Sequence, residues 1–470
     1  WNVPERDTEA AAHFDLASSI LVGGKNSPLY KELVYEKQIA TNVSSFYYDR
    51  EIAGMFFITA DVVPGVDPAI VEQSMDEVME AFIKKGPSTK LLKAEKTKAI
   101  AGFIRGIQRI GGFGGKSDLL ATCQTYTGNP GCYQESAKYL DAATSSKIKA
   151  TFAEWIDDTP YVLTILPSDQ YGLSDESVDR STGVPYPTEK VSFKFPTLQT
   201  ATLSNGAKVV LAQRSDVPLV EMNFQFNFGY AQENNDELGF TNFMMDMLNE
   251  GTKKYSSLEF DQILDSLGSN IGFGSGLDSS FVSISSLKDN LDETLDLAKE
   301  AVMYPTFPLD EIERIKKQTL AAFKREEFRP ASIAFRNIGN LLYGQDHPYG
   351  KLLIGSGVSE TIRSLTQSDL SSIHKRTLNP KNLTFVVAGD ISLDEITQTL
   401  EKKFGSWNAD MSSPLKDLSN VELPDTRIVY LIDKPNAQQS YIVAGQLLPP
   451  TATAEEIELN YMNYAIGGSF

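Results

Sequence analysis

The sequence contains an internal repeat, in which similar segments recur at an offset of 220 residues. LKAEKTKAIAGF, Leu92 to Phe103, precedes IERIKKQTLAAF, Ile312 to Phe323, by this offset, and both place apolar residues at helical spacing between lysines. PYVLTILPSD, from Pro160, corresponds in the same way to NLTFVVAGD, from Asn382. Each of these two runs predicts a buried strand that closes its unit, since it is short, β-rich and ended by turn residues. The repeat therefore predicts two copies of one α/β unit.

A second similarity, at about twice that offset, indicates a third copy that begins near the C-terminus. SSILVGG, Ser18 to Gly24, resembles NYAIGGS, Asn463 to Ser469. A run rich in charge, glycine and proline between the first two copies is typical of a linker. Because the sequence starts at Trp1 and stops just after a helix-like run, we expect both ends to be internal to a longer polypeptide. We expect four segments: a unit that lacks its first strands (1–173), the linker (174–190), a complete unit (191–419) and the truncated start of a further unit (420–470).

Composition restricts the classes of partner. The chain has 470 residues, which predicts two to four domains. Its 62 acidic residues against 43 basic ones argue against nucleic acid and against anionic lipid, since both need clustered Lys and Arg. No apolar run approaches the roughly 18 residues of a membrane span. We therefore expect no nucleic-acid partner and no membrane span.

Strand and helix patterns in the complete unit predict its fold class. LSNGAKVVLAQR carries an Asn205-Gly206 hairpin signal, and PLVEMNFQFNFG alternates as a half-buried strand. SNIGFGSG and SSFVSISSL predict an antiparallel pair, and DNLDETLDLAKEAV and LDEIERIKKQTLAAFKREEF predict two amphipathic helices. Runs of helices between runs of strands favour an α+β fold, with helices packed on one face of an antiparallel-rich sheet.

The run GFTNFMMDMLNEGT, Gly239 to Thr252, has the frame of a zinc-peptidase helix without its ligands. An inverted zincin carries H-x-x-E-H, in which two imidazoles four residues apart bind zinc and the glutamate activates a water. Here the three degenerate ligand positions hold Asn242, Met245 and Asp246. A thioether neither takes a proton nor binds zinc strongly, and an amide with a carboxylate does not replace two imidazoles. We therefore assign no catalytic and no metal-binding residue in this chain.

The remaining candidate ligands do not supply a metal site either. The chain has only His13, His347 and His374, and no two of them lie within one helical turn of each other. We expect each to be a surface or capping histidine. Asp246 and Glu250, four residues apart, could hold a cation, but capping or surface roles are the more common outcome.

The two cysteines, Cys123 and Cys132, bracket the turn-rich run QTYTGNPG. Two readings remain open: a disulfide, which would imply an oxidising compartment, or a pair of free thiols. We favour the disulfide, and with it an exported protein that is periplasmic or extracellular.

Taken together, several motifs resemble the pitrilysin/insulinase family of zinc metallopeptidases, the inverted zincins. They occur in the family's order along almost the whole chain: GGKNSPLYKELVYEKQIA (23–40), LSNGAKVVL (203–211), GFTNFMMDMLNEGT (239–252), LLYGQDHPYG (341–350) and GDIS (389–392). The resemblance implies a metallopeptidase clamshell of two halves, each built of two α/β domains of the LuxS/processing-peptidase-like type. It also implies that zinc lies on only one of the four domains.

The resemblance further implies that this chain spans the second domain, the zinc-free third domain and the start of the fourth. The family's third zinc ligand, a glutamate, would fall near Leu320 to Phe323, a run without an acid. Zinc is therefore expected upstream of Trp1, in an N-terminal domain of the parent protein. The arginine and tyrosine with which the family grips substrate would lie beyond Phe470.

The function implied by this resemblance is that of a non-catalytic portion of a zinc-dependent endopeptidase. Its residues would form a chamber wall and a substrate-binding surface for peptides or unfolded polypeptides. Its other partners would be the remaining domains of the parent chain or a catalytic partner subunit. The alternative is a natively inactive scaffold or partner subunit of a peptidase-like complex.

Overall fold

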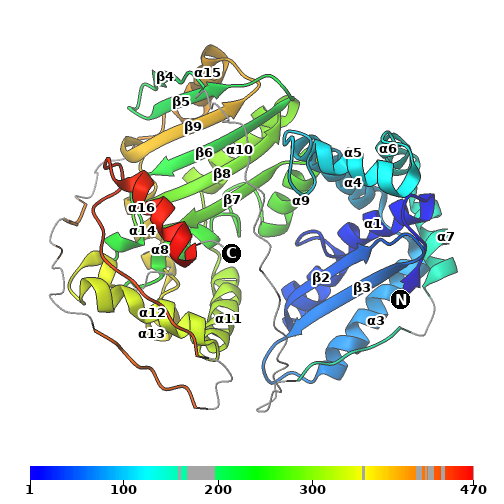
Figure 1. Cartoon of the computed structure of the whole chain (residues 1–470), viewed down its shortest axis with the longest axis horizontal. Helices are drawn as coiled ribbons and strands as arrows, with labels where there is room; N and C mark the ends of the chain where they lie inside the picture. Colours follow the sequence, from blue (N-terminus) through cyan, green and yellow to red (C-terminus); the bar gives the residue numbers. More distant parts are fainter. Residues whose placement is uncertain are drawn as a thin grey trace.

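The computed structural model describes residues 1–156, 160–166, 196–351, 355–408, 415–418, 421, 428–435 and 440–468. Two sheets, each with its own helices, lie side by side in Figure 1. The linker expected at 174–190 lies outside the described residues. None of the helices in the described ranges is long and apolar enough to cross a membrane.

The first sheet has three antiparallel strands in the order β1-β3-β2. Its strands are β1 (Asn2–Val3), β2 (Ala40–Tyr48) and β3 (Gly54–Val62). The helices and the π-helix η1 that accompany it are α1 (Glu9–Val22), α2 (Pro28–Tyr30), η1 (Lys31–Glu36), α3 (Pro68–Lys85), α4 (Thr89–Gly106), α5 (Lys116–Thr127), α6 (Tyr133–Ala142) and α7 (Ser145–Trp155). Phe14, Phe56 and Phe152 pack ring against ring at the centre of this core.

The second sheet has six strands in the order β4-β5-β9-β6-β8-β7, and only the pair β5 and β9 is parallel. Its strands are β4 (Gln199–Thr202), β5 (Lys208–Gln213), β6 (Leu219–Phe226), β7 (Asn270–Ser275), β8 (Ser280–Leu287) and β9 (Leu383–Gly389). Antiparallel pairing therefore dominates, and the fold is α+β, as the sequence predicts.

Helices of the second unit fill the connections between these strands. They are α8 (Phe240–Asp246), α9 (Ser257–Leu267), α10 (Leu291–Met303), α11 (Leu309–Glu326), α12 (Pro330–Tyr343), α13 (Ser359–Ser364), α14 (Gln367–Thr377) and α15 (Leu393–Phe404), with short 3-10 turns η2 (Tyr230–Gln232), η3 (Lys288–Asn290), η4 (Pro348–Gly350) and η5 (Pro380–Asn382). Phe224 of β6, Phe385 of β9 and Phe404 of α15 are fully buried and in mutual ring contact. The apolar face of the sheet is thus covered by α10 and α15.

Side-chain caps set the starts of several helices. Before α9, Ser256 Oγ accepts from the backbone N–H of Glu259, whose carboxylate accepts in return from Ser256 N. Ser392 and Glu395 repeat the pattern at α15. Because each box satisfies N–H groups that a helix start leaves unpaired, the S-x-x-E spacing predicts these starts directly.

The helices α4 and α11 reproduce the repeat, since both their first and their last residues lie 220 positions apart. Each is followed by a second helix, α5 or α12, after a short connection. The two segments therefore build the same helical pair in their respective units.

The strand expected from Pro160 does not form. Residues 160–166 are described without any strand, and Tyr161 and Ile165 are 86% and 84% exposed. The reason is the lack of a partner. In the second sheet, the corresponding β9 lies between β5 and β6 and is hydrogen-bonded to both, whereas the first sheet has only the two residues of β1 in the place of β6.

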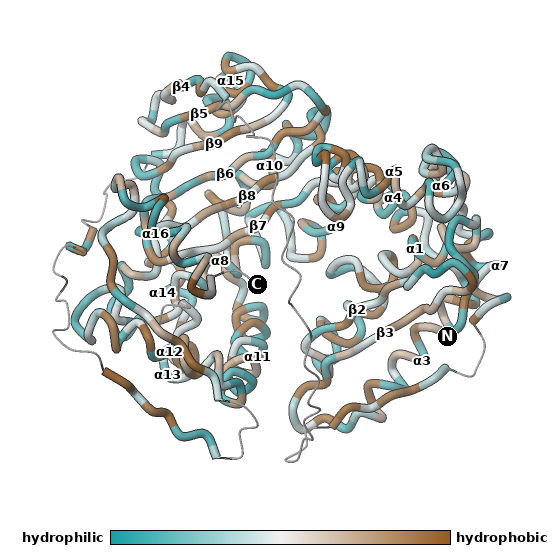
Figure 2. The backbone as a smooth tube through the Cα atoms, in the orientation of Figure 1, coloured by the Kyte–Doolittle hydropathy of each residue, from teal (hydrophilic) through white to brown (hydrophobic). Residues whose placement is uncertain are grey.

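The C-terminal part of the chain contains helix α16 (Glu456–Asn463) and the π-helix η6 (Tyr464–Gly468). Before them, the described residues 428–435 run as an extended, largely hydrophobic segment, visible as a brown stretch in Figure 2. Val429 and Leu431 are each 92% exposed. These residues form no strand in the described structure, although their composition is typical of one.

Candidate functional site

The helix with the zinc-peptidase frame, α8, is held at its N-terminus by a buried carboxylate. Glu233 accepts hydrogen bonds from the backbone N–H of Gly239, at 2.8 Å, and of Thr241, at 2.6 Å. Burial raises the pKa of Glu233 to about 7, although these hydrogen bonds work in the opposite direction. The carboxylate therefore anchors the start of the helix.

Gly239 sets the angle at which the chain enters α8. Its φ is +92°, in the left-handed region that favours glycine. An added Cβ would lie 2.7 Å from the Cα of Gly357. Close backbone packing between these two glycines thus fixes the position of the helix.

The side chains at the three degenerate ligand positions lie in different surroundings. Asn242 uses its Nδ2 to donate to the backbone O of Gly355, at 2.9 Å, and Met245 is fully buried in the core. Asp246 is exposed to solvent, yet partial desolvation by the protein around it, and then the charge of Glu250, raise its pKa to about 6. At the place of the family's third ligand, Leu320 and Phe323 pack into the core. These residues do not fit zinc.

Among the described residues, no group of three or more His, Cys, Asp or Glu side chains is arranged to hold a metal ion. The histidines also lie in separate surroundings. His347 accepts through Nδ1 from the backbone N–H of Tyr349, as a cap, and His374 Nε2 lies 2.8 Å from the backbone O of Val302. The prediction that His13 is a surface or capping residue is wrong. The His13 side chain is 3% exposed and lies on the buried side of α1, with its Nδ1 2.7 Å from Thr151 Oγ1. Helix α7 covers this position, which no local pattern in α1 reveals.

A buried ion-pair network stands beside the degenerate helix. Glu250 binds Lys25 at 2.8 Å and Arg314 at 2.7 Å, and Arg314 binds Glu311 at 2.6 Å. Tyr35 donates to the second oxygen of Glu311 at 2.6 Å. Burial alone would raise the pKa of Glu250, but Lys25 and Arg314 outweigh it and lower the pKa. The expected surface role of Glu250 is therefore wrong, because it is 6% exposed and paired.

This network joins the two units. Lys25 comes from the GGKNS segment of the first unit, and its neighbour Asn26 donates to the backbone O of Leu258 in α9 at 2.8 Å. On α4, Arg105 donates to Ser285 Oγ and to the backbone O of Gly268, each at 2.7 Å. The sequence analysis named both the GGKNS segment and Glu250, but no local pattern indicates that the two pair across 225 residues.

The structure joins Cys123, in α5, to Cys132, just before α6, in a disulfide. The bridge closes the short turn between these two helices.

Comparisons with known proteins match most of the chain to models of one peptidase family. A family model described as the peptidase M16 inactive domain matches residues 1–99 and 364–470, and the model of the insulinase family, peptidase family M16, matches residues 208–355. The chain belongs to this family, which is the pitrilysin/insulinase family of metallopeptidases.

Curated relatives are distant and longer than the matched region. An uncharacterized zinc protease of Mycobacterium leprae is 22% identical over 270 residues, which cover 57% of this chain and 59% of that protein. A non-peptidase homolog of Helicobacter pylori, YmxG, is also 22% identical, over 283 residues that cover 59% of this chain and 64% of that protein. The chain thus spans less than two thirds of the length of these relatives.

Some solved structures are similar to about half of the chain. The peptidase M16 inactive domain from Pseudomonas fluorescens is 27% identical with a TM-score of 0.44, and the match covers 48% of this chain and 54% of that one. The first half of the periplasmic protease PqqL from Escherichia coli is 19% identical, with a TM-score of 0.44 and coverage of 49% and 51%.

Proposed function

We propose that this chain is a non-catalytic portion of a zinc-dependent endopeptidase that acts on peptides or unfolded polypeptides. Zinc and hydrolysis would be supplied by other domains of the parent chain or by a catalytic partner subunit. The observation that carries this proposal is the state of α8, a helix that resembles the family's ligand helix. Of its three side chains at the ligand positions, Asn242 bonds to the backbone, Met245 packs in the core and Asp246 faces solvent. Such a unit can bind and enclose substrate while another domain performs the chemistry.

The outer face of the first sheet supports a role in substrate binding. Phe46 and Phe57, paired across β2 and β3, stack with ring centroids 4.9 Å apart, and they are 45% and 37% exposed. Tyr48 and Met55 continue the same exposed apolar row. An unfolded chain offers apolar side chains that would pack on such a row, whereas a folded protein keeps its own buried.

The alternative proposal is a natively inactive scaffold or partner subunit of a peptidase-like complex. One observation favours it: a relative of similar length coverage is named a non-peptidase homolog. Both proposals agree that this chain does not itself hydrolyse peptides. They differ in whether the polypeptide that contains it carries an active site elsewhere.

A single experiment separates them. Zinc content and cleavage of a quenched fluorescent peptide are measured on this chain and on the polypeptide that contains it together with its neighbouring domains. Zinc and activity in the longer protein alone support the first proposal, a non-catalytic portion of a zinc-dependent endopeptidase. Zinc and activity in neither support the scaffold, and zinc-dependent cleavage by this chain alone contradicts both.

We also propose that the protein is exported to the periplasm or the extracellular space. The disulfide between Cys123 and Cys132 supports this, because such bonds persist mainly in oxidising compartments. Mass spectrometry of protein alkylated directly after cell lysis tests it. Two alkylated cysteines in the native protein would argue for a reducing compartment.

A further inference from the structure

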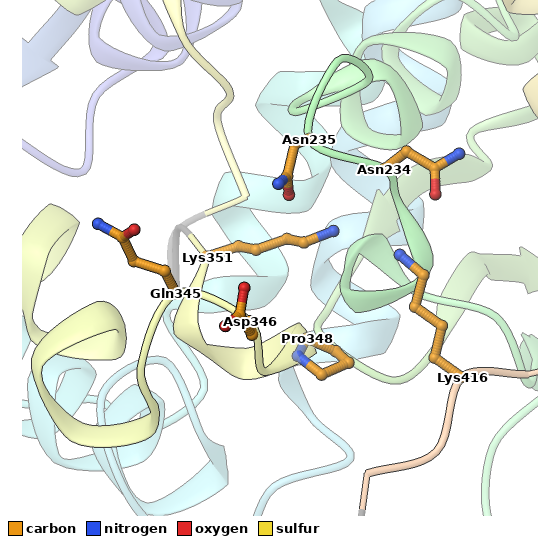
Figure 3. Close-up of a pocket in the computed structure, with 7 residues that line it drawn as sticks. All are labelled: Asn234, Asn235, Gln345, Asp346, Pro348, Lys351 and Lys416. Atoms are coloured by element: carbon orange, nitrogen blue, oxygen red, sulfur yellow. The ribbon is translucent and has the colours of Figure 1, made fainter.

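A cavity of about 280 Å³ lies next to the start of the degenerate helix. Its walls come from the loop before α8, from the turn around η4 and from the segment that follows α15. Figure 3 shows Lys351 and Lys416 reaching toward one another from opposite sides. The lining residues are Asn234, Asn235, Gln345, Asp346, Pro348, Lys351 and Lys416.

The two ammonium groups converge on a single oxygen. Lys351 Nζ and Lys416 Nζ both donate to the backbone O of Glu233. Within the described part of the chain, neither lysine has a carboxylate within 4.0 Å, the limit for an ion pair. Lys25, Arg314 and Lys403, by contrast, each pair with a carboxylate. Each ammonium has three N–H donors, and one shared carbonyl leaves donors free on both.

The acidic groups around the cavity are mostly engaged elsewhere. The carboxylate of Glu233 accepts from the two N–H groups at the start of α8, and that of Glu237 is paired with Arg376 at 2.7 Å. Asp346 is the acidic member of the lining. With both lysines protonated and Asp346 ionised, the lining carries one net positive charge, in a protein whose formal net charge is −19.

The proximity of the two ammonium groups changes the pKa of Lys351. Burial, and then the nearby Lys416, lower the pKa of Lys351 to about 8. A bound anion would relieve this repulsion, and it would replace water around two partly desolvated ammonium groups. The cavity therefore has the charge and the donors of an anion site, and its three neutral amides can bond to polar groups next to the anion.

We propose that this cavity binds a carboxylate carried by an extended peptide. A single net positive charge suits a monoanion better than a phosphate dianion, since Asp346 would repel the second negative charge. Asn234, Asn235 and Gln345 would bond to the peptide backbone next to the carboxylate. The inference rests on the proposed function for the peptide that carries this group, while the anion site rests on the cavity itself.

The test uses a fluorescein-labelled, unstructured peptide with a free C-terminal carboxylate and one internal glutamate, with affinity measured by fluorescence anisotropy. Lys351→Gln and Lys416→Gln are each expected to weaken binding about tenfold, the effect of losing one charge-assisted hydrogen bond. Lys351→Arg, which keeps the charge, should lose less. Lys402→Gln, an exposed lysine of α15, is the matched control and should bind as the unchanged protein does.

Two further peptides identify which carboxylate is bound. One has an amidated C-terminus, and the other has glutamine in place of the glutamate. Weaker binding of the first assigns the cavity to a peptide C-terminus, and weaker binding of the second assigns it to an acidic side chain. Equal affinities of all three peptides for the unchanged protein and for both glutamine variants would overturn the inference and leave the proposed function standing.

A measurement with a free monocarboxylate tests the anion site without a peptide. Acetic anhydride labels lysines competitively, and mass spectrometry reports each site in the presence and absence of N-acetylglycine. N-acetylglycine should protect Lys351 and Lys416 several-fold and leave Lys402 unchanged. Protection by N-acetylglycine in a protein that binds none of the peptides supports the anion site and contradicts the peptide-binding role, whereas unprotected lysines overturn the anion site.

Discussion

At the scale of single residues, the degenerate ligand helix has been turned into a structural element. Met245 fills the core, and Asn242 ties α8 to the backbone of Gly355. The charges that remain nearby are held in pairs. Glu250 and Glu311 share Arg314, which is 6% exposed along its side chain, so removing one partner leaves carboxylates in a site without solvent.

Arg314→Met is expected to destabilise the protein by about 3 to 5 kcal/mol, because it leaves Glu311, and in part Glu250, without a counter-charge in the interior. Urea unfolding followed by circular dichroism measures the change. Arg214→Met is the matched control, since its pair with Asp216 is 68% and 74% exposed, and it should change stability by less than about 1 kcal/mol. Similar losses in the two variants would show that the buried network has no special role.

Glu233 gives the folded protein a dependence on pH. Its pKa is raised to about 7 from an ordinary 4.5, so the folded state takes up a proton that the unfolded state does not hold between these values. The contribution of Glu233 to the free energy of unfolding is therefore fully present below about pH 4.5. It is lost as the pH rises to about 7, at up to about 1.4 kcal/mol per pH unit. Unfolding free energies at pH 5, 6, 7 and 8 for the unchanged protein and for Glu233→Gln measure this contribution.

Asp265, whose pKa is raised to about 7, mainly by burial, adds a slope of the same sign. It remains in the Glu233→Gln variant and acts as an internal control. The variant should keep part of the slope and lose the share of Glu233. An identical slope in both proteins would mean that the carboxyl at the start of α8 is ionised throughout this range.

At the scale of elements, the turn into α8 depends on glycine geometry as well as on the carboxylate of Glu233. Gly239 combines a φ of +92° with a backbone neighbour at 2.7 Å from its missing Cβ. Gly128, at the end of α5, is also in the left-handed helical region, with φ +69°, but has open space around it. The two positions therefore separate backbone strain from steric conflict.

Gly128→Ala should cost about 1 kcal/mol, the ordinary cost of placing a side chain in the left-handed helical region. Gly239→Ala should cost clearly more, by about 1 to 3 kcal/mol, since Gly357 must also move. Thermal unfolding of both variants compares them. Equal shifts would show that the contact with Gly357 relaxes freely and that α8 is loosely placed.

At the scale of the whole molecule, polar contacts hold the two units together. Lys25 and Asn26 reach from the first unit to Glu250 and α9. Arg105 donates hydrogen bonds to the end of α9 and to Ser285 of β8. Helices α4 and α9 pack along the same boundary, as Figure 1 shows. This boundary sets how the two sheets face each other.

Arg105→Met, which removes three hydrogen bonds across this boundary, is expected to weaken docking of the units without unfolding either. We propose domain limits at 1–173 and 191–419, so mild proteolysis within 174–190 should yield two products. Size-exclusion chromatography should find them together in the unchanged protein and partly separated in the variant. Cleavage that destroys both products would contradict these limits.

Local patterns predicted several elements, mainly in the second unit. Alternating and β-rich runs predicted β6 and the antiparallel pair β7 and β8, and the repeat at 220 residues predicted that α4 and α11 occupy corresponding positions in the two units. The strand at 160–166 was wrong because a strand needs a neighbour, and its local composition cannot report that neighbour's absence from the first sheet. His13 and Glu250 were misplaced for a similar reason, since their partners lie on distant segments.

The sequence by itself determined the fold class, the family and the lack of zinc ligands at positions 242, 245 and 246, because residue type and short-range spacing carry this information. Only the tertiary structure decided which charges are buried together and where two lysines meet beside α8. The reason is physical. An ion pair or a shared carbonyl depends on distances between segments that are far apart in the chain, and these distances exist only once the core has formed.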